Sequence, residues 1–307
     1  MSLQLLAVVL VVAVLDRLIG EPPARLHPVV WFGRAVDAID RPWSQPKAVG
    51  LLAAVGFPLA AAAVVWGVVA GASAVHAVFG VAAGVYVLFS STSHRLLVET
   101  AREVIALSET DLTRAREELL ALAGRDASEL SPALVRSAAV ESAAENLSDG
   151  LVAPLAAFGL AGVAASIAGW PALSAAAAAA AWVKAINTMD SMVGYRSNPI
   201  GWGPARLDDV VMWLPARLTA VCISAAAASP DPFLSGRRWA RVPSSPNAGW
   251  PMATIAAAVQ VRLEKPAVYT LNAVASLPTR REAERAVALT ERAGWLAIGL
   301  TGVIVSV

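Results

Sequence analysis

The chain has 307 residues, of which 57% are hydrophobic and only 15% are Asp, Glu, Lys or Arg, against roughly 25% in an ordinary soluble domain. Its 24 basic and 23 acidic residues are too few to cover the surface of a soluble domain of this length, so the composition indicates a membrane protein. The same values exclude a disordered chain, and a net charge of +1 leaves no basic excess for binding nucleic acid. Cys222 is the single cysteine, which excludes a disulfide scaffold.

The N-terminal part contains two apolar stretches that are candidates for membrane spans. Residues 2–15 end at Asp16 and cross a bilayer if the helix continues through Ile19. A signal peptide is the alternative, but the segment has neither a basic start nor a small-residue cleavage site. Residues 48–94 carry no charge, which allows two helices of about 20 residues each, with a turn expected near Gly71–Ser73.

Three more apolar stretches lie in the C-terminal half. Residues 150–183 are uncharged and are interrupted at Gly169–Pro171, so we expect two helices there, the second of them rich in alanine. The segment Val210–Ser229 is broken by Pro215 and Arg217, and it crosses the membrane, re-enters it or lies buried without crossing. The last fifteen residues, from Ala293, are uncharged and suit a C-terminal anchor.

Charge is concentrated in residues 95–149, which hold 17 of the 47 charged residues. Leucines at helical spacing predict a helical hairpin with a loop around Gly124–Pro132. The expected fold class is therefore all-α: a polytopic membrane helix bundle of five or six helices, formed by one domain over 1–307, with 95–149 as a water-facing insertion. The basic residues of 16–47 and 95–149 share one face, which the positive-inside rule assigns to the cytoplasm.

Four clusters of polar residues interrupt the apolar chain, and ionisable groups at membrane depth usually have a function. The first cluster, Asp16–Val30, contains His27 and forms either a site or a solvated interfacial loop. The second places Glu141, Glu145 and Asp149 at i, i+4 and i+8, on one face of a helix. Such a row suits Mg²⁺, which takes one or two carboxylates with water and phosphate oxygens; the alternative is a solvated acidic face.

The other two clusters combine acids with cations. In Lys184–Arg196 the two terminal cations can bind phosphate, while the alternative is a helix end at which Asp190 serves as the N-cap. In the fourth cluster, Arg206 precedes the pair Asp208–Asp209, which either holds a metal or begins a helix. The segment Ser244–Pro251 has the composition of a loop with an exposed aromatic residue.

Motif searches restrict the chemistry. The chain has no phosphate-binding loop, no dinucleotide fingerprint and no nucleophile elbow, and its three histidines are too scattered for a zinc site. A nucleotide would therefore bind without a standard loop. A small transporter or channel component remains the alternative class, because intramembrane acids suit an ion pathway, although no inverted repeat is found.

Five segments in a fixed order resemble a known family, the membrane-bound cobalamin-biosynthesis family CobD/CbiB, adenosylcobinamide-phosphate synthase. They are DRLIGEPPARLHPVVWFGR (16–34), VESAAENLSDGLVAPL (140–155), KAINTMDSMVGYRS (184–197), ARLDDVVMWLPARLTA (205–220) and SPNAGWP (245–251). The resemblance extends from about residue 10 to residue 270.

The resemblance implies an ATP-dependent amide ligase. It would join adenosylcobyric acid to the amine of aminopropanol or its phosphate, with ATP and Mg²⁺ as cofactors and a bilayer as environment. Other corrinoid-pathway enzymes are expected partners, and a scaffold that recruits them is compatible with catalysis.

Within that reaction we assign roles by side-chain chemistry: acids hold Mg²⁺ or orient the amine, cations bind phosphate, and His27 or a carboxylate takes the amine proton. The expected catalytic residues are His27, Glu141, Glu145 and Asp190. Substrate and phosphate binding is expected at Asn146, Lys184, Asn187, Ser191, Arg196, Arg206, Asn247 and Trp250, the last two facing the corrin. The expected metal ligands are Glu145, Asp149, Asp208 and Asp209.

Overall fold

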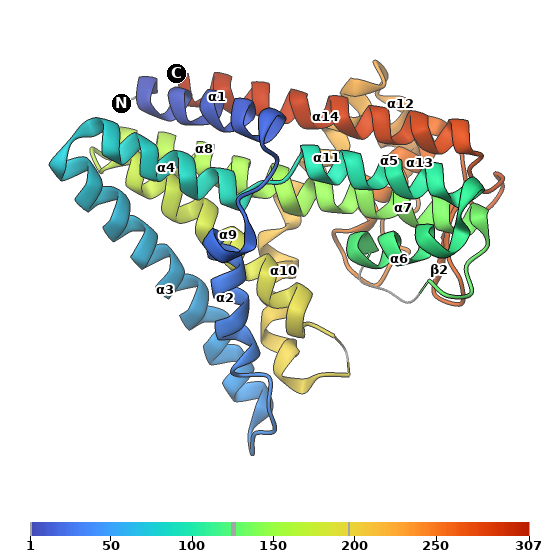
Figure 1. Cartoon of the computed structure of the whole chain (residues 1–307), viewed down its shortest axis with the longest axis horizontal. Coiled ribbons are helices and arrows are strands. Elements are labelled where there is room, and N and C mark those ends of the chain that lie inside the picture. Colours follow the sequence, from blue (N-terminus) through green and yellow to red (C-terminus); the bar gives the residue numbers. More distant parts are fainter. Residues whose placement is uncertain (1, 124–126, 196, 307) are drawn as a thin grey trace. The chain divides into compact units, whose positions relative to one another are not determined.

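The computed structural model describes residues 2–123, 127–195 and 197–306, and helices make up most of this part of the chain (Figure 1). The chain divides into two compact units. The first unit takes in the residues up to Ser93, the segment Asp149–Met212 and the residues from Ile298 on. The second takes in His94–Ser148 and Trp213–Ala297.

Helices α8 and α9 pack together in the first unit, and α9 also packs against α3 (Figure 1). Apolar side chains hold this packing: Met189 and Val193 of α9 are buried against Val36 and Ala53. The elements of this unit are α1 (Ser2–Leu18), η1 (Ala24–Leu26), α2 (Pro28–Asp37), α3 (Pro46–Val75), α4 (Ala77–Ser91), η2 (Ser148–Val152), α8 (Ala153–Ile167), α9 (Ala172–Val193), η3 (Pro199–Gly201) and α10 (Trp202–Val211).

The break between α3 and α4 lies later than the sequence predicts. The turn expected near Gly71–Ser73 is helical, and α3 continues to Val75. The helix ends at His76, whose backbone is extended, and Nδ1 of His76 accepts a hydrogen bond from the backbone amide of Val78 at 3.2 Å. His76 thus caps α4, whereas glycine and serine residues alone do not stop an apolar helix.

Helix α3 approaches the start of α10 so closely that side chains are excluded at the contact. A Cβ atom on Gly50 would collide with the carbonyl oxygen of Ile200, and a Cβ on Gly203 would lie 2.8 Å from Cα of Leu51. The absence of side chains at Gly50 and Gly203 therefore permits backbone-to-backbone packing in this unit.

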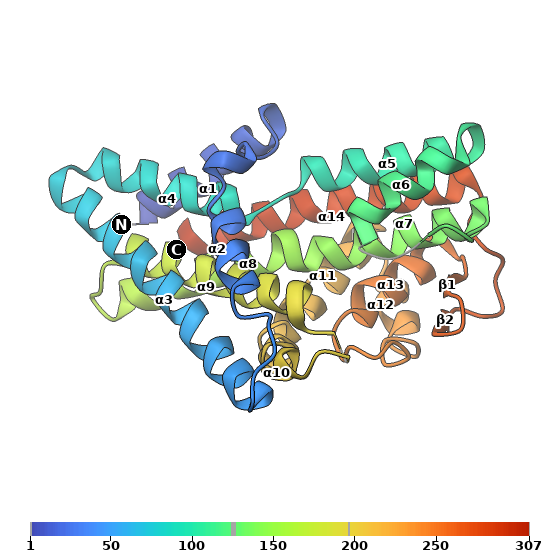
Figure 2. The ribbon, with the colours of Figure 1, turned by 60° about the horizontal axis from the view of Figure 1, so that its bottom comes forward.

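The second unit begins with the segment His94–Ser148, which forms three helices, α5, α6 and α7. Figure 2 shows α5, α6 and α7 side by side, as their packing requires. Ser131 caps α7 by accepting a hydrogen bond from the amide of Leu134 at 3.3 Å. Part of the predicted loop, 124–126, lies outside the described residues. The elements are α5 (Arg95–Thr110), α6 (Leu112–Ala123), α7 (Pro132–Leu147), α11 (Trp213–Ala226), α12 (Asp231–Gly236), α13 (Gly249–Val259), β1 (Leu263–Lys265), β2 (Tyr269–Leu271) and most of α14 (Arg280–Ser306).

A short antiparallel hairpin in this unit was not predicted by the sequence pattern. Strands β1 and β2 pair in the register Leu263 to Leu271 and Lys265 to Tyr269. Each strand has three residues, which is too short for an alternation of polar and apolar residues to be recognisable.

The all-α membrane-helix class is confirmed. By length and composition, the described residues include four helical stretches suited to crossing a membrane: Pro46–Val75, Ala77–Thr110, Pro132–Ile167 and Arg280–Ser306. A fifth is added if Pro199–Val211 and Trp213–Ala226 form one broken span. Neither α1, which has 17 residues, nor α9, whose C-terminal half is polar, belongs to this set, so four or five helices of the described residues meet the criterion, against the five or six expected.

The close contact of α3 predicts a position-specific effect of adding a methyl group. Gly50→Ala should lower the free energy of unfolding by about 1–3 kcal/mol, because the new Cβ meets backbone atoms that cannot rotate away. Thermal unfolding of the purified protein in detergent measures this effect. Gly56→Ala, in the same helix with nothing within 4 Å of the added atom, is the control and should be neutral or slightly stabilising. Equal melting temperatures for both variants would contradict the close packing.

Candidate functional site

The C-terminal half of α9 carries polar and apolar residues on different sides. Ile186, Met189 and Val193 recur at i, i+3 and i+7 and are buried. Lys184 and Asn187 follow the same spacing on the polar side. The apolar stripe packs within the unit and thereby fixes the direction of the polar residues.

Asp149 is brought to α9 by an irregular helical turn. The segment η2 is a π-helix, with a wider turn than the α-helices before and after it, and such turns often occur at functional sites. The carbonyl of Gly150 accepts a hydrogen bond from the amide of Ser93 at 2.8 Å, which ties η2 to the end of α4. Nδ2 of Asn187 donates to Oδ2 of Asp149 at 3.3 Å, so the expected residues Asp149 and Asn187 do come together.

Lys184 is a half-buried cation whose charge is matched by acids from two other segments. Burial lowers the pKa of Lys184, and the negative charges of Asp149 and Glu21 act in the opposite direction. A partly buried lysine whose protonation depends on its surroundings is suited to binding an anion.

Glu21 and His27 form the second pair of the site. Nε2 of His27 lies 3.7 Å from Oε2 of Glu21, and His27 is only 9% exposed. The His27 side chain lowers the pKa of Glu21, burial opposes this shift, and the Ser93 hydroxyl and Lys184 contribute further lowering. Nδ1 of His27 is buried and has no hydrogen-bond partner among the described residues. Glu21 was not among the expected site residues. Its position in the first polar cluster, Asp16–Val30, was the only sequence feature that pointed to a role in the site.

Three further acids lie where helices end. Asp190 is in the last turn of α9, and Asp208 and Asp209 are in the last turn of α10. The alternatives in which Asp190 is an N-cap and the Asp pair begins a helix are therefore wrong. Acids at a helix C-terminus are disfavoured by the helix dipole, so these residues need another explanation.

These acids also repel one another. Burial, and to a smaller extent the charge of Asp209, raises the pKa of Asp190 to about 6. The carboxylate of Asp208 experiences the negative charges of Asp149, Asp190 and Asp209. Oδ1 of Asp208 is buried and accepts no hydrogen bond within the described part of the chain.

The carboxylate oxygens of these acids are suited to Mg²⁺ only in part. Carboxylate oxygens are its preferred ligands, and the unpartnered Oδ1 of Asp208 near Asp149 is the kind of atom a cation would satisfy. Across the described residues, however, no three side chains of His, Cys, Asp or Glu gather into a group that could hold a metal. Any Mg²⁺ here would use one or two protein carboxylates, with the remaining ligands from water and phosphate.

Glu141 lies in the second unit and is fully hydrogen-bonded there. Its Oε1 accepts from the Ser137 hydroxyl at 2.8 Å and its Oε2 from the Tyr269 hydroxyl at 2.6 Å, and Glu141 is 2% exposed. The same Ser137 hydroxyl accepts from the amide of Glu264 at 2.8 Å. Glu141 thus joins α7 to the hairpin, which the row Glu141, Glu145 and Asp149 did not predict.

Asn247 and Trp250 surround an arginine that the expected set did not include. A terminal nitrogen of Arg217 donates to Oδ1 of Asn247 at 2.7 Å, and the guanidinium lies 4.8 Å from the ring centre of Trp250 and 4.6 Å from that of Trp213. Cations over aromatic faces are held electrostatically, so Arg217 organises this cluster within the second unit.

The remaining expected residues have separate surroundings. Nδ2 of Asn146 donates to the carbonyl of Leu122 at 3.0 Å, and the exposed Ser191 hydroxyl donates to the carbonyl of Asn187 at 2.9 Å. Arg206 lies 3.5 Å from Oδ2 of Asp209. Glu145 is half-buried in α7, and Arg196 lies outside the described residues.

The fold and these polar groups define a class: a helical membrane protein whose buried charges gather near helix ends. A family model described as CobD/Cbib protein matches residues 9–296. "Probable cobalamin biosynthesis protein CobD" of Methanothrix thermoacetophila is 37% identical over 312 residues, covering 97% of this chain and 96% of the relative. "Cobalamin biosynthesis protein CobD" of Geobacter metallireducens is 39% identical over 281 residues (86% and 82%), and that of Klebsiella pneumoniae is 36% identical over 275 residues (83% and 81%).

The chain therefore belongs to the CobD/CbiB family and is a biosynthetic enzyme of the cobalamin pathway. No solved structure matches it.

The environment of Asp190 predicts that a neutral replacement stabilises the protein. Because its pKa is raised, the folded state binds this proton more tightly than the unfolded chain does, and stability falls as the pH rises to about 6. At pH 7.5, Asp190→Asn should therefore increase stability by about 1–3 kcal/mol. Melting temperatures of both proteins in detergent between pH 4.5 and 8 would diverge up to about pH 6.

The control is Asp37→Asn, which neutralises an exposed acid at the end of α2. It should leave the melting temperature unchanged over the same range. An Asp190→Asn protein that melts below the wild type at pH 7.5 would show that this carboxylate stabilises the fold and would contradict the repulsion argued above.

Proposed function

We propose that this chain is an ATP-dependent amide ligase that joins adenosylcobyric acid to aminopropanol or its phosphate. The observation that carries the proposal is the collection of incompletely neutralised charges in the first unit, in which the charges of Glu21 and Asp149 act on Lys184 and those of Asp149, Asp190 and Asp209 act on Asp208. Buried charges with disfavoured ionisation are concentrated at functional sites. Family membership supports the pathway, and the chemistry of these side chains supports the reaction.

The reaction needs the corrinoid carboxylate to be activated. ATP transfers its γ-phosphoryl group to the carboxylate, ADP leaves, the amine then attacks the acyl carbon, and phosphate and one proton are released. Lys184 is the group that binds a phosphate oxygen, since it is a cation with donors in a partly desolvated place. Mg²⁺, when bound, neutralises phosphate charge, and Asp149 and Asp208 are the carboxylates suited to hold it.

The amine must lose a proton as the amide bond forms. His27 is suited to accept it, because Nε2 faces Glu21 and the buried Nδ1 has no partner among the described residues. A carboxylate that holds the other ring nitrogen fixes the orientation of an imidazole base. Glu21 would therefore position His27 rather than touch the substrate.

The direct test uses purified protein with ATP, Mg²⁺, cobyric acid and aminopropanol phosphate. The expected product is a corrinoid whose mass increases by that of the amine minus water, with one ADP formed for each amide. Aminopropanol replaces its phosphate in a parallel reaction to identify the acceptor. Absence of ligation in every combination, with folded protein, would favour the transporter class.

Lys184→Met should lower kcat/KM for ATP at least about 100-fold, because the variant keeps a long side chain but has no charge for a phosphate oxygen. ATP-dependent product formation in detergent measures this loss. Lys47→Met, at an exposed position near the start of α3, is the matched control and should retain full activity. Lys184→Met activity within about threefold of the wild type would remove Lys184 from phosphate binding.

His27→Gln should lower kcat about 10²–10⁴-fold with little change in KM for ATP, because a general base acts on the amine and not on the nucleotide. Activity should recover as the pH is raised, because more of the amine substrate is then already deprotonated and the reaction depends less on a base. Glu21→Gln should have a smaller effect in the same direction. A loss that is equal at every pH would contradict the role of His27 as a base.

A further inference from the structure

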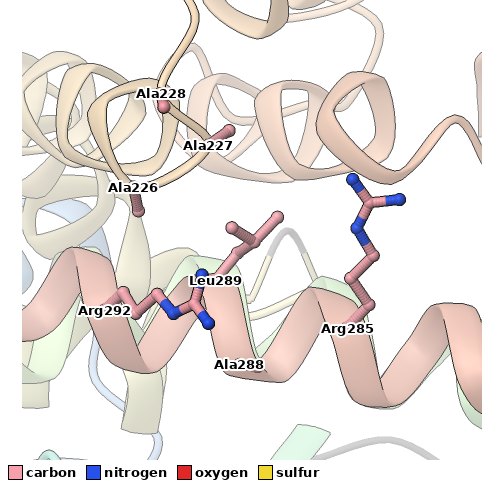
Figure 3. Close-up of a pocket in the computed structure, with 7 residues that line it drawn as sticks. All are labelled: Ala226, Ala227, Ala228, Arg285, Ala288, Leu289 and Arg292. Carbon is pink, nitrogen blue, oxygen red and sulfur yellow. The ribbon is translucent and has the colours of Figure 1, made fainter.

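The second unit contains a cavity that the proposed reaction does not use. Its volume is about 330 Å³, within the size range of small-molecule sites. One wall is formed by Ala226–Ala228, and the other by Arg285, Ala288, Leu289 and Arg292 of α14. Figure 3 shows Leu289 between the two arginines on α14, facing the alanine turn.

The alanine wall is the end of α11, and its small side chains leave the cavity open. The amide of Ser229 donates to the carbonyl of Ser224 at 3.2 Å, and that of Ala228 to the carbonyl of Ala225 at 2.9 Å, which is the pattern of a Schellman turn. The residue at its left-handed position is Ala228, with a φ of 55°, where glycine is usual. The turn therefore presents methyl groups and no polar side chain to the arginines.

Both arginines lack a partner within the described part of the chain, unlike Arg280 and Arg102 of the same unit. Nε of Arg280 lies 2.8 Å from Glu284, and Arg102 pairs with Glu291. Arg285 and Arg292 are exposed, and no hydrogen bond or ion pair joins either to a described residue. Two unpaired guanidinium groups beside an apolar cavity are suited to an anion, because arginine binds phosphate with paired donors.

The position of the cavity along α14 indicates where the anion would come from. Arg292 is the last charged residue of the chain, and residues 293–307 carry no charge. Helix α14 is long and apolar enough to cross a membrane. A cation at the point where a helix becomes apolar lies at the level of lipid headgroups. Leu296, one turn after Arg292, is 44% exposed and continues the apolar surface.

We propose that this cavity binds the phosphate of an anionic amphiphile, with Arg285 and Arg292 as donors and with Leu289 and the alanine wall against its apolar part. A phospholipid headgroup and a soluble phosphate ester share the phosphate chemistry, and the apolar continuation of α14 favours the lipid. The binding does not depend on ligase activity, so this proposal and the proposed function succeed or fail separately.

The test measures binding of phosphatidylglycerol to the purified full chain in detergent, by native mass spectrometry and by the shift in melting temperature. Phosphatidylcholine, which adds a cation to the headgroup, and soluble glycerol 3-phosphate are run in parallel. The Arg285→Gln/Arg292→Gln double variant should bind phosphatidylglycerol at least about tenfold more weakly than the wild type. Ala227→Leu keeps both arginines, fills the cavity and should cause a similar loss.

Arg281→Gln, an exposed position on the same helix that does not line the cavity, is the control and should bind like the wild type. If the double variant binds glycerol 3-phosphate more weakly than the wild type does but binds phosphatidylglycerol equally well, the cavity is a phosphate site whose ligand is soluble, and the lipid is excluded. If neither ligand binds more weakly to the double variant or to Ala227→Leu, the proposal is overturned. If the double variant does not fold, phosphatidylglycerol binding to Ala227→Leu alone tests the proposal.

Discussion

The first unit depends on the burial of one cation among acids that come from distant parts of the sequence. Lys184 is on α9, Glu21 follows α1, and Asp149 is on η2, so three segments must meet for its charge to be matched. A charge that is partly removed from water is costly unless opposite charges match it, so this meeting stabilises the fold as well as supplying chemistry. The apolar packing of Met189 and Val193 on the other side of α9 keeps Lys184 in that place.

The same part of the molecule has more acid than this cation neutralises. Asp190, Asp208 and Asp209 all lie at helix C-termini, where the helix dipole opposes them, and they act on one another. Proteins break such local rules mainly at functional sites. An excess of carboxylates beside a lysine is suited to phosphate with a divalent cation, and this supports the ligase proposal more directly than the apolar helices do.

The sequence predicted the helical class, because this class depends on composition over many residues, and it located the polar clusters that contribute to the first unit. It placed Asp149 and Asn187 in two different polar clusters and did not predict that these residues meet. It did not predict Glu21 as a partner of His27, since the pair forms across a proline-containing turn. Nor did it predict the pairing of Glu141 with Tyr269, which are 128 positions apart and meet through a hairpin of three-residue strands.

The regular row Glu141, Glu145 and Asp149 does not continue past Glu145, for a physical reason. Glu141 and Glu145 lie in the regular helix α7, whereas Asp149 lies in the π-helix η2, so the spacing of i, i+4 and i+8 no longer places Asp149 on the face of the other two. The buried acids also differ in their hydrogen bonds. Glu141 is held by two hydroxyl donors and serves the packing of its unit, whereas the buried Oδ1 of Asp208 has no donor among the described residues. Buried acids of similar appearance in the sequence thus differ in whether the fold already satisfies their oxygen atoms, and an acid with an unsatisfied oxygen is the better candidate for holding a cation.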